Sequence, residues 1–274
     1  MPETQLQRSR GKALVSFAVV AGRTRLRDLS QAGSAKAMLP RVAGVVPEVV
    51  FLNTSGGLTG GDRLEYGLTL GPGCRVCATS QTAERAYAST GPAAAVRIGA
   101  TVAAGAWLDW LPQETILFEA SHLQRDTEID LAADAGCLLI EQVVLGRHAM
   151  GETLRDARLT DRRMVCRSGR PVWAEVFRLD AQVLQAQSPA LLGEARAFAT
   201  IALIAPDAPD ALNCLRAVLD EPGCVAAASG WDGKCIARIT ARDGWPLKRQ
   251  IARAMAALRD GPAPRVWQMQ GVTS

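Results

Sequence analysis

Four carboxylates are the residues of this chain best placed to do chemistry. They are Asp62, Glu65, Glu84 and Glu141. Glu141 interrupts the apolar run at 137–145, and a buried carboxylate is costly unless it is paired or hydrogen-bonded. One interpretation is that each of the four forms a salt bridge with one of the many arginines. The alternative is a set of hard oxygen ligands that lines a path for a divalent cation.

A glycine-rich segment at 53–62 precedes the second of these carboxylates. It lacks the Gly-Lys-Ser/Thr ending of a phosphate-binding loop, and Asp62 at its end would repel a phosphate. The glycines at positions 56, 57, 60 and 61 indicate backbone at positive φ or in close approach to another group. The segment is therefore either a structural turn or a loop that lets a partner or ion come near the backbone.

Histidine and cysteine do not supply a recognisable catalytic or zinc motif. The chain has two histidines, His122 and His148, and neither an H-E-x-x-H nor a G-x-S-x-G sequence. Cys74 and Cys77 are three residues apart in a predicted strand, so their sulfurs should point to opposite faces. The seven cysteines are an odd number with irregular spacing, which is typical of buried thiols in a reducing compartment.

Short strands separated by turn residues must position these side chains. The predicted hairpins join 14–20 to 23–29, 64–70 to 74–79, 154–165 to 171–179, and 224–228 to 234–240. Near-alternation predicts a half-buried strand over 123–131, and the apolar run predicts a buried central strand over 137–145. Helical spacing is clear only at 209–220 and 246–260.

This pattern predicts a mainly β fold: many short, mostly antiparallel strands with two helices near the C-terminus. No linker and no repeat of fixed period is visible, so we expect one domain over residues 1–274, with the first ~10 residues flexible.

The overall composition is that of an ordinary globular protein. The chain has 274 residues, 48% hydrophobic and 21% charged, and a net charge of +4 that does not demand a polyanionic partner. No apolar run is long enough to span a bilayer, and no secretory signal is visible at the N-terminus. We therefore expect a cytoplasmic protein with no membrane partner.

Several segments together resemble the urease accessory protein family UreD, also called UreH. They are N-T-S-G-G-L-T-G-G-D-R-L-E at 53–65, T-S-Q-T-A-E-R-A-Y at 79–87, W-L-P-Q-E-T-I-L-F-E at 110–119, G-R-H-A-M-G-E at 146–152 and P-R-V-W at 264–267. They occur in the family's order, and the resemblance runs from about Lys12 to Trp267.

The resemblance implies a non-enzymatic maturation factor. Proteins of this family bind the urease apoprotein together with UreF and the nickel-carrying GTPase UreG, and are thought to pass Ni²⁺ toward the urease active site. They have a mainly β fold with two helices and have been described with an internal tunnel. We therefore expect no tightly bound cofactor, only transient Ni²⁺.

Mapped onto this chain, the expected nickel path comprises Asp62, Glu65, Glu84 and Glu141. A chain with two histidines and no cysteine cluster is a poor nickel store and a plausible conduit, since imidazole and thiolate groups hold nickel well. Glu152 ends one of the resembling segments and could instead form a structural ion pair with Arg147.

Two other functions were weighed. A metal-dependent hydrolase could use the same carboxylates, but it needs its metal ligands on one face, and their spacing in the sequence does not show that they lie on one face. A nucleic-acid binder could use the Arg-rich stretches at 154–178 and 238–265 and would bind in a salt-sensitive way. Only 5% of the residues are aromatic, and acids interleave with the arginines, so we expect no nucleic-acid partner.

Overall fold

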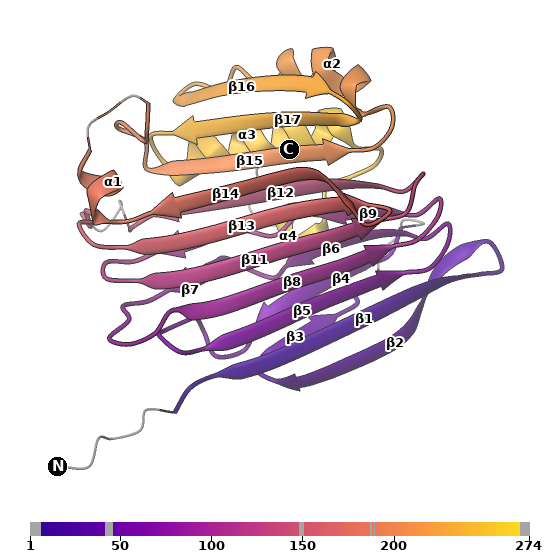
Figure 1. Cartoon of the computed structure of the whole chain (residues 1–274), viewed down its shortest axis with the longest axis horizontal. Helices are drawn as coiled ribbons and strands as arrows, with labels where there is room; N and C mark the ends of the chain where they lie inside the picture. The colour runs from indigo at the N-terminus through magenta and orange to yellow at the C-terminus, as the bar shows by residue number, and fades with distance from the viewer. Residues whose placement is uncertain (1–6, 42–45, 148–150, 187, 189, 269–274) are drawn as a thin grey trace.

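Two β-sheets packed face to face form the body of the protein (Figure 1). The computed structural model describes residues 7–41, 46–147, 151–186, 188 and 190–268. The first sheet, sheet A, has the strand order β14-β13-β11-β8-β5-β1-β2, and the second, sheet B, has the order β16-β17-β15-β12-β9-β6-β4-β3 with β7 and β10 beside this path. The mainly β fold predicted from the sequence is confirmed.

The strands of sheet A are β1 (Arg10–Val20), β2 (Arg23–Gly33), β5 (Arg63–Leu70), β8 (Ala94–Val102), β11 (His122–Leu131), β13 (Arg158–Arg167) and β14 (Arg170–Leu179). Those of sheet B are β3 (Ala35–Met38), β4 (Glu48–Asn53), β6 (Arg75–Ser80), β7 (Glu84–Ala86), β9 (Trp107–Trp110), β10 (Thr115–Leu117), β12 (Gly136–Leu145), β15 (Ala197–Ile204), β16 (Cys224–Trp231) and β17 (Lys234–Ala241).

The expectation of mostly antiparallel strands is wrong. Among the described residues, nine strand pairs are parallel and six are antiparallel. Through the middle of the chain, strands alternate between sheet A and sheet B. A strand in this region therefore pairs in parallel with strands that come earlier or later in the sequence, whereas the next strand in the sequence usually lies in the other sheet, across the core. For example, β8 pairs with β5 and β11, and β9 lies in sheet B.

The turn at 71–73 shows why the prediction failed there. It was expected to close a hairpin, but it carries the chain from β5 in sheet A to β6 in sheet B. The corner at 103–106, between β8 and β9, stacks on it: Gly73 N donates to Ala104 O at 2.9 Å, and Trp107 N donates to Cys74 O at 2.8 Å. A short glycine-rich corner therefore looks the same in sequence whether it closes a hairpin or joins two sheets. The other three predicted hairpins are present as β1–β2, β13–β14 and β16–β17.

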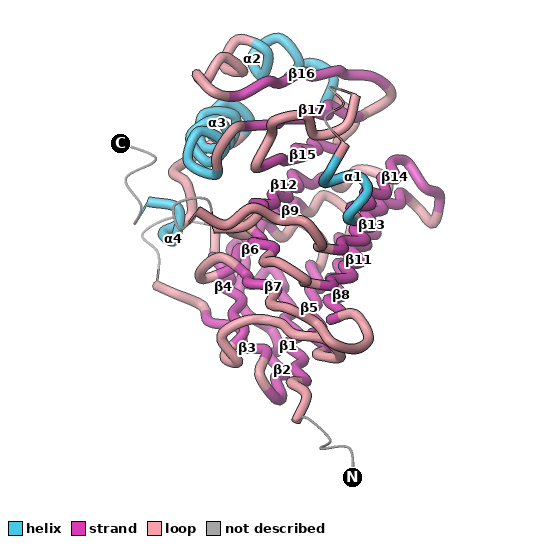
Figure 2. The backbone as a smooth tube through the Cα atoms, turned by 90° about the vertical axis from the view of Figure 1, so that its left-hand side faces the viewer, coloured by secondary structure: helices cyan, strands magenta, loops and turns pink. Residues whose placement is uncertain are grey.

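Helices cover the face of sheet B that points away from sheet A (Figure 2). The principal one is α3 (Gly244–Leu258), close to the predicted 246–260. The predicted helix at 209–220 is shorter, a 3₁₀ turn η2 (Ala208–Ala211) that leads into α2 (Leu212–Arg216), and no side chain caps either N-terminus. Two short helices were not predicted, α1 (Ala181–Gln185) and α4 (Arg265–Gln268).

The hydrophobic core has two layers that explain the long apolar strands. One layer lies between the sheets and includes Phe51 and Tyr66, whose ring centroids are 5.0 Å apart. The other lies between sheet B and the helices, and includes Ile251 and Trp267. Strand β12 is buried on both faces, as the apolar run at 137–145 predicted, and so is β15, where no strand was predicted. None of the helices in the described part of the chain is both long and apolar enough to cross a membrane.

Candidate functional site

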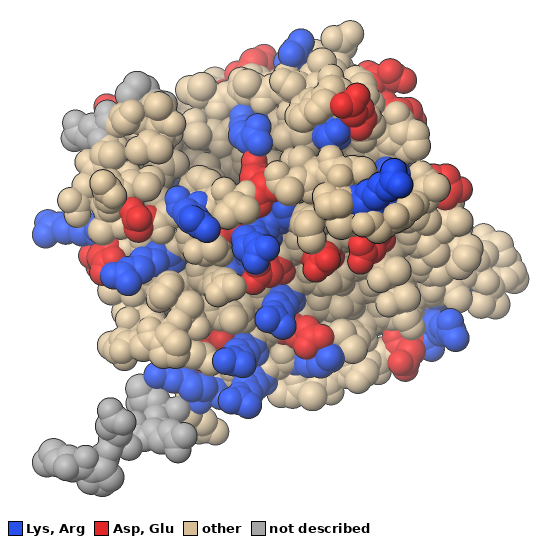
Figure 3. Space-filling model, in the orientation of Figure 1, with Lys and Arg blue, Asp and Glu red and all other residues tan. Residues whose placement is uncertain are grey.

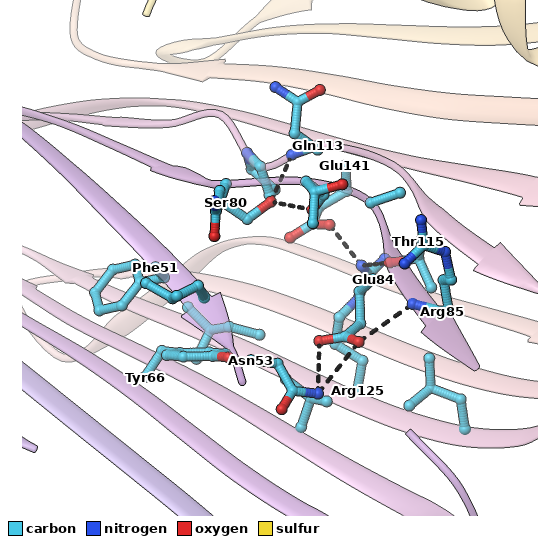
Figure 4. Close-up of a pocket in the computed structure, with 18 of the residues that line it drawn as sticks. Phe51, Asn53, Tyr66, Ser80, Glu84, Arg85, Gln113, Thr115, Arg125 and Glu141 are labelled. Carbon is cyan, nitrogen blue, oxygen red and sulfur yellow. Dashed lines mark hydrogen bonds and ion pairs between the residues drawn. The ribbon is translucent and has the colours of Figure 1, made fainter. Parts of the chain in front are cut away.

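A small cavity lies between the two sheets and is the candidate functional site (Figure 4). It holds about 110 Å³, and strands of both sheets contribute to its wall. Its aromatic lining residues are Phe51, Tyr66 and Trp110. Its polar lining residues include Asn53, Ser80, Glu84, Arg85, Gln113, Thr115, Arg125 and Glu141. The fold therefore brings two of the four expected carboxylates, Glu84 and Glu141, to one cavity.

Glu84 begins the short strand β7, which is tied to the segment before β10 because Glu84 N donates to Glu114 O at 2.9 Å. Its carboxylate accepts hydrogen bonds from Asn53 Nδ2 at 3.3 and 3.4 Å and from Arg85 N at 3.2 Å. Burial raises the pKa of Glu84 to about 7, since these bonds and the nearby charge of Arg85 offset only part of the desolvation. The cavity thus contains a carboxyl group that changes charge near neutral pH.

Glu141 stands in the middle of β12 and is buried. Its Oε1 accepts a hydrogen bond from Trp110 Nε1 at 2.8 Å, and its Oε2 lies 2.8 Å from Arg125 Nη1. That second contact is an ion pair without the alignment of a hydrogen bond, so Oε2 has no hydrogen-bond donor. Glu141 is therefore paired with an arginine, as one interpretation of the sequence expected, and its side chain also lines the cavity.

Arg125 continues a buried ionic network away from the cavity. Its Nε donates to Asp161 Oδ1 at 3.0 Å, and Asp161 is also paired with Arg163. Burial alone would raise the pKa of Asp161, but the guanidinium groups of Arg125 and Arg163 outweigh it and hold the pKa at about 2. Arg163 reaches Glu175 at 3.0 Å, and Glu175 in turn pairs with the exposed Arg238 at 2.7 Å. The network links the cavity to the surface through alternating charges.

Sequence reasoning missed the inner members of this network, although a signal was present. Alternation over 123–131 marked positions 123, 127, 129 and 131 as inward-facing, and Arg125 occupies the remaining inward position. On β13, Asp161 and Arg163 likewise fall in phase with the buried Leu159 and Val165. A charged residue in the apolar phase of a strand indicates a buried ion pair.

Asp62 lies outside the lining of the cavity and organises the glycine-rich segment. It is buried, and its carboxylate oxygens accept Ser9 N at 2.7 Å and Thr59 N at 2.8 Å. Gly57 shows why this segment needs glycine, because it has a φ of +152° and a Cβ there would lie 2.3 Å from the Tyr87 ring. Asp62 and the glycines thus hold the segment in a tight turn, and the charge of Asp62 makes a small addition to the desolvation that raises the pKa of Glu84.

Glu65 lies on the outer face of sheet A, because the alternate residues Leu64 and Tyr66 point into the core. It pairs with Lys12 at 2.8 Å, and both side chains are about half exposed (50% and 48%). The strand register places them in one row across the sheet: Lys12, Glu65, Arg97, Asp126 and Arg162. Figure 3 shows this face, on which basic and acidic side chains are interspersed.

Arg147 and Glu152 form the ion pair that the sequence left open. Arg147 donates from both its backbone N and its Nε to Glu152 Oε2, each at 2.9 Å, and its guanidinium lies 4.8 Å from the Phe118 ring centroid. Partial burial would raise the pKa of Glu152, but the hydrogen bonds from Arg147 and Glu119 outweigh it and lower the pKa. His148, between these two residues in sequence, lies outside the described residues.

The thiols and the described histidine form no metal cluster with the carboxylates. Cys74 and Cys77 are both buried free thiols, as expected for structural cysteines. Within the described ranges, no group of three or more His, Cys, Asp or Glu side chains is arranged to hold a metal ion. The cavity carboxylates instead contact protein groups: Asn53 donates to Glu84, Trp110 donates to Glu141, and Arg125 forms an ion pair with Glu141.

Fold and site together define a two-sheet β protein with a charged interior cavity and a helical cover. The family described as UreD urease accessory protein matches residues 9–268. A urease accessory protein UreD of Cereibacter sphaeroides (strain ATCC 17025) is 60% identical over 268 residues, which cover 97% of this chain and 98% of that protein. UreD proteins of Paracoccus denitrificans and Rhizobium leguminosarum bv. trifolii are 52% and 41% identical, over 97% of this chain and 94% and 97% of their own lengths. The chain belongs to the UreD family of urease accessory proteins.

Proposed function

We propose that this chain is a non-enzymatic urease maturation factor of the cytoplasm that binds the urease apoprotein together with UreF and UreG. Within that complex it helps deliver Ni²⁺ to the urease active site through its interior. Membership of the urease accessory protein family supports the role in maturation. The cavity between the sheets supports the finer proposal of a nickel path.

The observation that carries the path is the convergence of Glu84 and Glu141 on one cavity. Carboxylate oxygens bind Ni²⁺ less tightly than imidazole or thiolate groups do, so they can accept and release the ion. Each carboxylate already has protein partners, Asn53 for Glu84, and Trp110 and Arg125 for Glu141. An arriving cation must compete with these partners, which favours transit over storage.

Asp62 remains a candidate for an outer position on the path. The charge of Asp62 influences Glu84 although Asp62 does not line the cavity. Glu65 is held by Lys12 on the outer face of sheet A, away from the cavity, so we leave it out of the proposed path and use it as the surface control. The alternative of a metal-dependent hydrolase gains no support from the cavity, because neither carboxylate there is free to bind a resident metal without losing a partner.

A complementation experiment tests the proposal. The urease operon is expressed in a urease-negative host with nickel, with this chain, without it, or with Glu84→Gln, Glu141→Gln or Glu65→Gln. We expect nickel-free urease without the chain and reduced nickel per urease with either cavity variant, while the variant chains still co-purify with urease. Glu65→Gln is the matched surface control and should load nickel nearly normally.

Several outcomes contradict the proposal or one part of it. Full nickel loading of urease in the absence of the chain would contradict the maturation role. Full nickel loading with both Glu84→Gln and Glu141→Gln would contradict the path through the cavity, and so would a loss of loading in Glu65→Gln as large as theirs. Loss of the urease complex in Glu141→Gln identifies Glu141 as a folding residue instead.

A further inference from the structure

One wall of the cavity is a connecting segment that strand pairing alone does not hold. Residues 111–114 join β9 to β10, and Pro112 and Gln113 line the cavity. On the inner side, Gln113 N donates to Ser80 Oγ at 2.9 Å, and Glu114 O accepts the backbone N–H of Glu84 at 2.9 Å. The position of Glu84 in the cavity therefore depends on where this segment lies.

The outer side of the same segment is anchored by the helical cover, more than 130 residues later in the chain. Lys248 of α3 donates from Nζ to Gln113 Oε1 at 2.8 Å and pairs with Glu114 Oε2 at 3.1 Å. Trp267 of α4 donates from Nε1 to Leu111 O at 3.0 Å, and its ring centroid lies 5.4 Å from the Lys248 ammonium. Both residues are buried, so these contacts are shielded from water.

A buried lysine is costly unless its charge is paired or hydrogen-bonded. Leu247 and Ile251 on the same helix pack into the core, whereas the Lys248 ammonium contacts two polar side chains of the connecting segment, those of Gln113 and Glu114. The ammonium thereby fixes the side chains of Gln113 and Glu114 and leaves the Glu114 carbonyl facing Glu84.

We propose that Lys248 is a positioning residue: through Gln113 and Glu114 it sets where Glu84 stands in the cavity. The inference deepens the proposed function, because it rests on the cavity as a nickel path, and it adds that the helical cover controls the shape of that path. A movement of α3 would be transmitted to Glu84 by the Lys248 contacts.

Amide hydrogen exchange at single-residue resolution on the full-length chain tests the positioning without reference to nickel. In Lys248→Met, which keeps the length and apolar stem, we expect the Glu84 amide to exchange about 10- to 100-fold faster, as the loss of a charge-assisted hydrogen bond predicts. The Gly73 amide, bonded to Ala104 O at a corner outside the cavity wall, should be unchanged. Lys248→Arg keeps the charge and should restore most of the protection.

The matched control is Arg249→Met on the next residue of α3. Arg249 pairs with Glu221 at 3.1 Å and forms no hydrogen bond or ion pair with the segment at 111–114, so its replacement should leave the Glu84 amide protected. If Lys248→Met does not fold, Glu114→Gln weakens the same contact from the other side, and we expect faster exchange at Glu84 there too.

Nickel loading of urease with the same variants distinguishes the positioning role of Lys248 from the proposed nickel path. Faster exchange at Glu84 with reduced nickel loading supports both the positioning role and the path. Faster exchange with normal nickel loading supports the positioning role and contradicts the path. Unchanged exchange in Lys248→Met and Glu114→Gln, or an equal change in Arg249→Met, overturns the inference.

Discussion

Arg125 Nη1 on sheet A and Glu141 Oε2 on sheet B lie 2.8 Å apart, so an ion pair in the lining of the cavity joins the two sheets. The pair does not stand alone, because Arg125 also binds Asp161 and Glu141 also accepts from Trp110. Glu141 therefore belongs both to the protein core and to the candidate site, so its replacement should change the stability of the fold as well as the site.

Replacing Glu141 by alanine should destabilise the fold by about 3–5 kcal/mol, because it leaves the buried Arg125 short of a counter-charge. Urea unfolding of the full-length chain measures the change. The surface variant Glu65→Ala, which removes a half-exposed pair with Lys12, should cost less than about 1 kcal/mol. Similar costs for the two variants would contradict the buried network.

The raised pKa of Glu84 predicts a specific pH dependence. The folded chain holds a proton on Glu84 up to about pH 7, whereas the unfolded chain releases it near its ordinary pKa of 4.5. Between these values the folded state binds more protons, so stability falls as pH rises, by about 1–3 kcal/mol in total for this group. The difference between wild type and Glu84→Gln, measured by urea unfolding from pH 4.5 to 7.5, should show this slope. A difference that does not vary with pH would rule it out.

Asp62 should act as a structural acceptor for the glycine-rich segment. Asp62→Ala leaves the backbone N–H groups of Ser9 and Thr59 without partners, at about 1–3 kcal/mol. Asp62→Asn keeps one acceptor oxygen and should recover about half of the loss. Thermal unfolding gives the stability order, and nickel loading at equal folded fraction tests function. Normal loading with Asp62→Asn would remove Asp62 from the nickel path.

Thiol labelling should report the burial of the cysteines. Of the seven described cysteines, Cys214 is exposed, Cys224 is partly exposed and the others are buried. Burial raises the pKa of Cys137 to about 12, so its thiolate is scarce at neutral pH as well as inaccessible. A chromogenic disulfide reagent should therefore modify one thiol rapidly in the native chain, and Cys214→Ser should abolish that phase. Rapid reaction of several thiols would contradict this packing.

Much of the local structure could be predicted because it depends on residues close together in sequence. Strand alternation identified β11, the apolar run identified β12, and helical spacing identified α3. Alternation also determined that Glu65 faces outward, since its neighbours Leu64 and Tyr66 are apolar, although the four carboxylates were grouped without using that signal.

Strand pairing could not be predicted in the same way. A short corner such as 71–73 fixes a change of direction, but the choice between a hairpin and a crossing to the other sheet depends on stacking against corners some thirty residues away, as with 103–106. The corners at 71–73, 103–106 and 132–135 have the sequences G-P-G, A-A-G-A and A-A-D-A, which share too little to indicate that the strands wind between the two sheets.

The sequence by itself determined the β class of the fold, the principal helix α3, the absence of a clear catalytic motif and the family to which the chain belongs. Only the tertiary structure decided that Glu84 and Glu141 share a cavity while Asp62 and Glu65 do not, and that Lys248 reaches that cavity's wall. The physical reason is that a side chain's direction follows from local alternation, whereas its partners come from strands and helices brought together by packing, such as Arg125 for Glu141 and Gln113 for Lys248.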